Sequence, residues 1–72
     1  MKRKLISEFW GDEKNPDRKA EIHHNLIYDH FEVDFYNKTE LKETRDMKTD
    51  GVIHSLRYAE DAAENWCLGY IP

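Results

Sequence analysis

Residues 55–69, SLRYAEDAAENWCLG, decide the fold, because they carry a helix-start signal, a helix-stop signal and a helical period between them. Ser55 is a favourable N-cap, since its hydroxyl can accept a hydrogen bond from a first-turn amide. Gly69 suits the left-handed conformation in which many helices end. We therefore expect a C-terminal helix over residues 55–68.

This helix has one side suited to burial. At about 100° per residue, the small and aromatic side chains fall together: Tyr58, Ala59, Ala62, Ala63, Trp66 and Cys67. The alanines would let a sheet approach closely, and the Trp66 indole N–H can donate to a partner. The other side carries Arg57, Glu60, Asp61 and Glu64. We favour an ordinary solvated face there, and the alternative is a docking surface for a basic partner.

The clearest strand pattern lies in residues 30–36, where apolar and polar side chains alternate. A turn at Asn37-Lys38 would pair this strand with residues 40–47. A two-residue loop sets Phe35 opposite Glu40, whereas a shift by one sets Phe35 opposite Leu41 and His30 opposite Asp46. We favour the second register, because the first mixes core residues with charged ones. Its outer face is wholly polar, and its inner face holds Phe31, Val33, Phe35, Leu41 and Met47, with Glu43 and Arg45 as charged exceptions.

The remaining segments complete one α+β domain over residues 1–72. Residues 4–10 fit a strand or a helix, and we favour a strand before a polar loop at residues 11–17. Residues 19–27 fit a strand with Ala20, Ile22, His24 and Leu26 on one face. We expect a basic segment and loop at 1–19, antiparallel strands within 20–53 and the helix at 55–68. The architecture is a small antiparallel sheet of three to four strands packed on one helix.

The block at residues 58–66, YAEDAAENW, followed by Gly69, resembles small uncharacterised proteins of tailed marine bacteriophages, including those that infect cyanobacteria. The resemblance covers the C-terminal half, from Phe31 onward. It transfers no activity to any residue. It implies a small accessory protein that acts on a host or phage macromolecule.

The composition indicates a folded chain with a small core. The sequence has 72 residues, 39% hydrophobic and 36% charged, near the lower limit for a self-sufficient domain. A homodimer that hides an edge or an apolar patch is therefore a possible state. Cys67 is the single cysteine, and its position on the apolar helix side predicts a buried, reduced thiol. Because only Leu5 and Ile6 follow the basic start before the polar Ser7 and Glu8, we expect no membrane segment and a cytoplasmic protein, in the host cytoplasm if phage-encoded.

Charge is unevenly distributed along the chain. Residues 1–19 hold six basic and four acidic side chains, a net +2, within a total net charge of −4. The remaining residues are therefore strongly acidic. This balance weakens a nucleic-acid function, because phosphate binding needs a concentrated cationic surface.

No catalytic or metal-binding motif is evident. The three glycines are scattered, and neither Cys-x-x-Cys nor His-x-x-x-His occurs. His23 and His24 would point to opposite sides of a strand and so could not easily share a metal. We expect surface histidines, no cofactor, no metal, no catalytic residue and no enzyme.

Two functions compete. The leading prediction is a non-enzymatic accessory protein that binds and modulates a host or phage protein. Its contact residues would be Trp10, Tyr28, Tyr36, Glu60, Asp61 and Glu64, with the aromatic side chains as anchors. The alternative is a small nucleic-acid-binding module that uses the basic N-terminal segment, namely Lys2, Arg3, Lys4, Arg18 and Lys19. A structural role in a virion is a third possibility.

Overall fold

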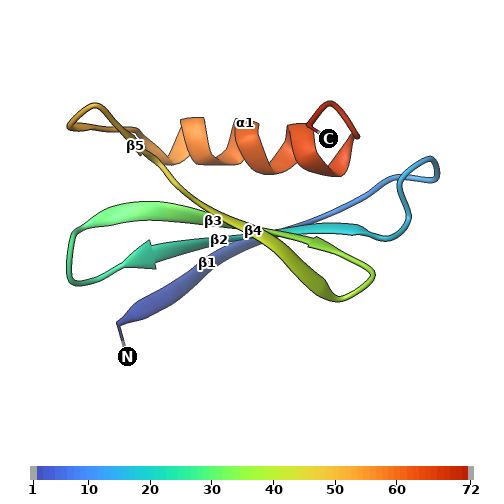
Figure 1. Cartoon of the computed structure of the whole chain (residues 1–72), viewed down its shortest axis with the longest axis horizontal. Helices are drawn as coiled ribbons and strands as arrows, with labels where there is room; N and C mark the ends of the chain where they lie inside the picture. The colour runs from blue at the N-terminus through green and yellow to red at the C-terminus, as the bar shows by residue number, and fades with distance from the viewer. Residues whose placement is uncertain (1, 72) are drawn as a thin grey trace.

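Four antiparallel strands form one sheet in the order β1-β2-β3-β4, in a computed structural model that describes residues 2–71. The strands are β1 (Arg3–Trp10), β2 (Arg18–Asn25), β3 (His30–Asn37) and β4 (Glu40–Asp46). A separate small hairpin of β5 (Lys48–Thr49) and β6 (Val52–Ile53) leads into the helix α1 (Leu56–Cys67). Figure 1 shows α1 lying along one face of the sheet. The predicted α+β architecture is confirmed.

The helix begins and ends where its cap residues indicate. The Ser55 side chain accepts a hydrogen bond from the Tyr58 amide at 3.3 Å, and Gly69 has a φ of 85°. The expected burial is confirmed for Ala59, Ala63, Trp66 and Cys67. It is wrong for Tyr58, whose ring is half-exposed and stacks on His54 with the ring centroids 3.9 Å apart. Within residues 2–71, no helix is long and apolar enough to cross a membrane.

Trp66 joins the helix to the sheet. Its ring stacks on Phe35 with centroids 5.0 Å apart, and its indole Nε1 donates to the Tyr36 carbonyl at 3.0 Å. The Arg18 guanidinium covers the Trp66 ring at 4.2 Å from its centroid. The core around this contact is small: Ala20, Ile22, Val33, Phe35, Met47, Ala59, Ala63, Trp66 and Cys67.

The predicted pairing of β3 with β4 is wrong. Lys38 and Thr39 both have positive φ and form the two-residue turn, so Asn37 faces Glu40. An irregularity between Phe35 and Tyr36 then shifts the register again, and Phe35 faces Glu43. Such a bulge adds one unpaired residue to a strand. The amino-acid composition alone does not show where that residue lies. Leu41 consequently lies opposite Tyr36, half-exposed on the outer face, which is therefore not wholly polar.

The observed strand pairing also sets the partners of His30 and Asp46 and the exposure of the two edge strands, β1 and β4. His30 pairs with Asn25 on β2, and Asp46 pairs with Glu32, so the expected pair of His30 and Asp46 lies on a diagonal instead. Every residue of β4 is exposed, because α1 packs mainly on β2 and β3. On β1, an irregularity between Leu5 and Ser7 places Leu5 opposite His23 on the outer face.

Replacing Trp66 with alanine should destabilise the domain by about 3–5 kcal/mol, as large-to-small core substitutions do. The change removes the stack on Phe35 and the bond to the Tyr36 carbonyl. Urea denaturation of Trp66→Ala measures the loss, and Trp10→Ala at an exposed site is the control. A loss below about 1 kcal/mol for Trp66→Ala would show that Trp66 is not the main contact between helix and sheet.

Candidate functional site

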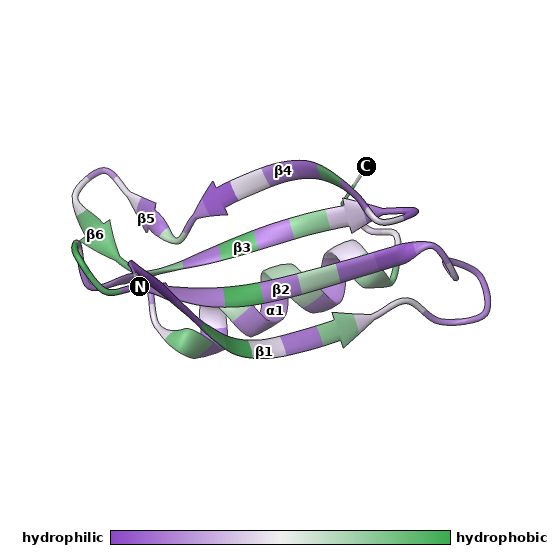
Figure 2. Cartoon of the chain, turned by 90° about the horizontal axis from the view of Figure 1, so that it is seen from below, coloured by the Kyte–Doolittle hydropathy of each residue, from purple (hydrophilic) through white to green (hydrophobic). Residues whose placement is uncertain are grey.

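The sheet face opposite α1, here the helix-free face, is rich in polar side chains. Facing residues of antiparallel strands share one side of a sheet. The pairing of β2 with β3 therefore collects eight side chains there: Lys19, Glu21, His23, Asn25, His30, Glu32, Asp34 and Tyr36. Figure 2 views the sheet with α1 behind it and shows hydrophilic and hydrophobic residues alternating along β2 and β3.

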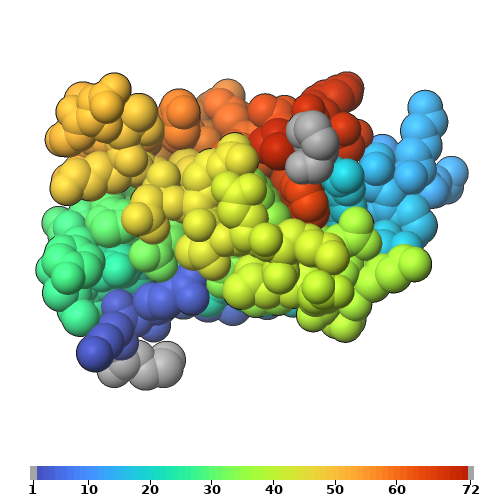
Figure 3. Space-filling view, viewed as in Figure 1, coloured from blue at the N-terminus to red at the C-terminus, as the bar shows by residue number. Residues whose placement is uncertain are grey.

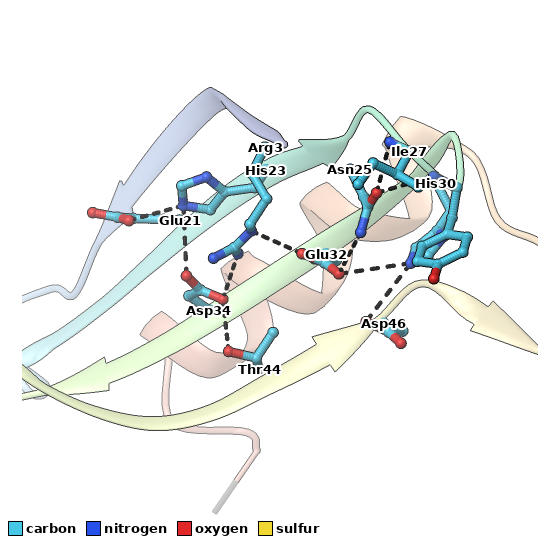
Figure 4. A network of polar contacts seen from close by, with 11 residues as sticks. Arg3, Glu21, His23, Asn25, Ile27, His30, Glu32, Asp34, Thr44 and Asp46 are labelled. Carbon is cyan, nitrogen blue, oxygen red and sulfur yellow. Dashed lines mark hydrogen bonds and ion pairs between the residues drawn. The ribbon is translucent and has the colours of Figure 1, made fainter. Parts of the chain in front are cut away.

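Asp34 is the centre of a polar network on this face, although its side chain is only 4% exposed. Its Oδ1 accepts from Arg3 Nη2 at 2.9 Å and from Thr44 Oγ1 at 2.9 Å, and its Oδ2 lies 3.5 Å from His23 Nε2 (Figure 4). These partners come from β1, β4 and β2 respectively. A buried carboxylate is tolerated when charges and hydrogen bonds of this kind compensate it.

Arg3 bridges two carboxylates of β3. In addition to the contact of Arg3 with Asp34, Arg3 Nε lies 2.8 Å from Glu32 Oε1. The two groups form an ion pair, but their geometry does not meet the criteria for a hydrogen bond. Burial lowers the pKa of the Arg3 guanidinium, but the contacts with Asp34 and Glu32 raise this pKa by a larger amount, so the net shift is upward. Arg3 is therefore held in the sheet by two acidic side chains.

An aromatic pocket lies at the other end of the helix-free face, beside the β1–β2 loop. It has a volume of about 310 Å³, and its lining includes Trp10, Pro16, Lys19, Tyr36 and Lys38. Trp10 is 67% exposed, and Lys19 Nζ lies 4.6 Å from its ring centroid and 5.7 Å from that of Tyr36. Lys19 Nζ is also 2.9 Å from Glu21 Oε2. The pocket thus combines two aromatic rings with a fixed ammonium group.

The Tyr36 phenol in this pocket stays protonated at neutral pH. Burial raises its pKa, and the nearby carboxylates of Glu21 and Asp34 raise it as well. A protonated phenol can both donate and accept a hydrogen bond. Tyr36 therefore adds a polar contact to the aromatic pocket.

The structure separates the six predicted contact residues into three surfaces. Trp10 and Tyr36 line the aromatic pocket. Tyr28 is 70% exposed in the β2–β3 turn, at the opposite end of the sheet. Glu60, Asp61 and Glu64 lie on α1, on the other side of the molecule. The predicted residues therefore do not form one interface.

Asp61 borders a second hollow, a groove between β4 and α1. The groove has a volume of about 350 Å³ and is lined by Arg45, Met47, Ala62 and Asn65 among others. Figure 3 shows this side of the molecule, with β4 in yellow-green and the helix in orange and red above it. Glu60 and Glu64 do not line this groove.

The five basic residues of the nucleic-acid alternative are also dispersed. Arg3 pairs with acidic side chains, Lys19 pairs with Glu21, and Arg18 donates to the carbonyls of Trp66 and Ile71. Within residues 2–71, Lys2 and Lys4 make no ion pair with another side chain. Phosphate binding needs concentrated free cations, and this arrangement supplies few.

The polar network was not predicted from the sequence, and the expectation of surface histidines is wrong for His30. His30 is buried, with 6% of its surface exposed, and is not a surface histidine. Two groups on this face combine one histidine with two carboxylates: Glu21, His23, Asp34 and His30, Glu32, Asp46. The alternating acids of residues 30–36 were the available signal, but their partners are fixed only by the pairing of distant strands.

No protein-family model, curated protein or solved structure matches the chain. The resemblance of residues 58–66 and Gly69 to phage proteins therefore stays a prediction. The geometry of the helix-free face is what bears on function.

Replacing Arg3 with alanine should cost about 1–3 kcal/mol of stability, because it leaves the buried Asp34 carboxylate with fewer partners. Lys4→Ala, at the exposed next position of the same strand, should stay within about 0.5 kcal/mol. Urea denaturation of both variants measures the difference. Equal stabilities would mean that Arg3 does not compensate Asp34.

Glu21 should make stability depend on pH in the acidic range. Burial raises the pKa of its carboxyl, but hydrogen bonds and charges from Lys19 and His23 lower it more, so the pKa lies below its ordinary 4.5. The folded state therefore binds this proton more weakly, and the resulting stability is present above about pH 4.5 and lost as the pH falls through the folded pKa.

Urea denaturation at about pH 5 and about pH 2.5 tests this prediction. The stability difference between the wild type and Glu21→Gln should shrink at the lower pH. Glu13→Gln in the exposed β1–β2 loop is the control, because it removes a carboxylate without removing the contacts of Glu21 with Lys19 and His23. A Glu21→Gln difference that is the same at both pH values would contradict the prediction.

Proposed function

We propose that the protein is a small non-enzymatic accessory protein that binds another protein through the aromatic pocket and thereby modulates it. The observation that carries the proposal is Trp10, which is 67% exposed beside Tyr36 and a hollow of about 310 Å³. Tryptophan and tyrosine are the residues that most often dominate binding energy at protein interfaces. Burying such rings against a partner would remove apolar surface from water.

The pocket is also organised before binding. Glu21 and Glu8 hold Lys19 at 2.9 and 3.5 Å, and the Lys19 ammonium lies over the Trp10 ring. A cation over an indole face is attracted to it, which restrains Trp10 at the surface. Restraint in the free state lowers the entropy lost on association. An apolar or aromatic side chain of the partner would stack on Trp10 while a polar group meets the Tyr36 phenol.

The resemblance of residues 58–66 to proteins of tailed phages supports a partner of host or phage origin. Under this proposal the protein acts in the cytoplasm of the host cell. A second copy of the chain is another possible occupant of the pocket, since the core is small. The sedimentation of the isolated protein distinguishes a homodimer from binding to a different protein.

A nucleic-acid-binding function ranks second, and one observation favours it. An exposed indole beside a lysine is a contact on which a single-stranded base can stack. The surrounding carboxylates of Glu8 and Glu21 oppose the approach of phosphate. Binding of this kind would fall steeply with salt, whereas a packed protein interface would change less.

Affinity capture from bacterial lysate with and without nuclease tests the proposal. The wild type should retain one protein in near-equal amount despite nuclease. Trp10→Ala should weaken its retention at least about tenfold, the effect of losing an aromatic anchor. Tyr28→Ala is the matched control, because Tyr28 is 70% exposed but lies at the other end of the sheet.

Three results would contradict the proposal. Equal retention by Trp10→Ala and the wild type would exclude the aromatic pocket as the interface. Loss of retention with Tyr28→Ala alone would move the interface to the β2–β3 turn. Loss of every retained protein after nuclease would favour the nucleic-acid alternative.

A further inference from the structure

His30 is a buried histidine whose ring nitrogens are not satisfied. Its side chain is 7% exposed, and neither Nδ1 nor Nε2 has a hydrogen-bond partner within residues 2–71. Buried polar atoms in folded proteins are nearly always hydrogen-bonded or bound to an ion. The surroundings of His30 Nε2 therefore need a physical explanation.

Two carboxylates face this nitrogen. His30 Nε2 lies 3.7 Å from Glu32 Oε2 and 3.7 Å from Asp46 Oδ1, and the three atoms are all within 4.8 Å of one another (Figure 4). A separation of 3.7 Å is too long for a hydrogen bond. Two ligands that each lie about 2.0–2.2 Å from one tetrahedral cation are themselves about 3.3–3.6 Å apart. The two distances of 3.7 Å from His30 Nε2 are close to this spacing.

We propose that His30, Glu32 and Asp46 bind a divalent transition-metal cation such as Zn²⁺. A neutral imidazole with two carboxylates is a donor set that suits zinc and related metals. Asp46 and Glu32, the second of which also pairs with Arg3, would place negative charge next to the cation. Asp46 is 59% exposed at its side chain, which gives the ion a path from solvent and leaves room for a water ligand.

The neighbouring side chains orient these ligands. Asn25 Nδ2 donates to Glu32 Oε2 at 3.2 Å, while Asn25 Oδ1 accepts from the amides of Ile27 and Tyr28. Arg3 holds the other oxygen, Glu32 Oε1, at 2.8 Å. Groups that bond to a metal ligand in this way fix its orientation and commonly affect metal affinity. Here they fix the Glu32 carboxylate with its Oε2 toward His30.

The second histidine group on the same face provides an internal comparison. Glu21, His23 and Asp34 have the same composition, but here the histidine itself has a hydrogen-bond partner. His23 Nε2 lies 3.0 Å from Glu21 Oε1, Lys19 pairs with Glu21, and Arg3 and Thr44 donate to Asp34. A cation there would have to replace the hydrogen bond between His23 and Glu21, whereas the ring nitrogens of His30 make no such bond. We therefore assign the metal to the His30 group alone.

Calorimetric titration of the full chain with ZnCl₂ at neutral pH tests the assignment. The wild type should bind one equivalent of Zn²⁺. Asp46→Asn and His30→Gln should weaken that affinity more than about tenfold, because losing a ligand should cost at least as much as losing a group that only orients a ligand. Asp46 is exposed, so Asp46→Asn should fold even if His30→Gln does not.

His23→Gln is the matched control and should retain the affinity of the wild type. The ring-nitrogen NMR signals should show Zn²⁺ shifting His30 Nε2 and leaving His23 in place. The proposal is overturned if the wild type shows no saturable binding, or if Asp46→Asn binds as tightly as the wild type. Loss of affinity in His23→Gln as large as that in Asp46→Asn would also overturn it.

Discussion

The packing of Trp66 against β3 is the contact on which the rest of the structure depends. The indole stacks on Phe35 and donates to the Tyr36 carbonyl, so one side chain fixes both the distance and the direction of α1 over the sheet. The Arg18 guanidinium covers the Trp66 ring and donates to the carbonyls of Trp66, in the last turn of α1, and Ile71, beyond the helix. The next residue, Lys19, and the Tyr36 side chain point to the aromatic pocket on the opposite face. The helix contact and the pocket are therefore built on the same short segments of β2 and β3.

On the helix-free face, a polar network takes the place of a second packed layer of secondary structure. Asp34 receives contacts from Arg3, His23 and Thr44, which belong to the other three strands. A slip of any strand by one residue would remove one of these contacts and leave a buried carboxylate undercompensated. The network therefore favours one register in a sheet with few apolar residues. The two proposed sites lie on this face at its two ends, the aromatic pocket beside the β1–β2 loop and the His30 group beside the β2–β3 turn.

Local signals made the elements predictable, whereas contacts between distant strands were not. Ser55, Gly69 and the alanine stripe define the helix, and the alternation of residues 31–36 defines β3. The pairing of β4 was mispredicted because a bulge next to Phe35 and a turn with two positive-φ residues shift it. Tyr58 was placed in the core by helical period alone, but α1 packs on β2 and β3 and leaves it at the margin. The site was the least predictable part, because Arg3 reaches Asp34 across 31 residues.

Exchange of the two tryptophan indole N–H groups with D₂O tests whether Trp66 fixes α1 to the sheet. The two rings lie in opposite environments, since Trp66 is 5% exposed and bonded to the Tyr36 carbonyl while Trp10 is 67% exposed. One indole signal in the NMR spectrum, that of Trp66, should persist long after transfer to D₂O, and that of Trp10 should disappear at once. If both signals disappear together, α1 is not fixed to the sheet by Trp66 and the account is wrong.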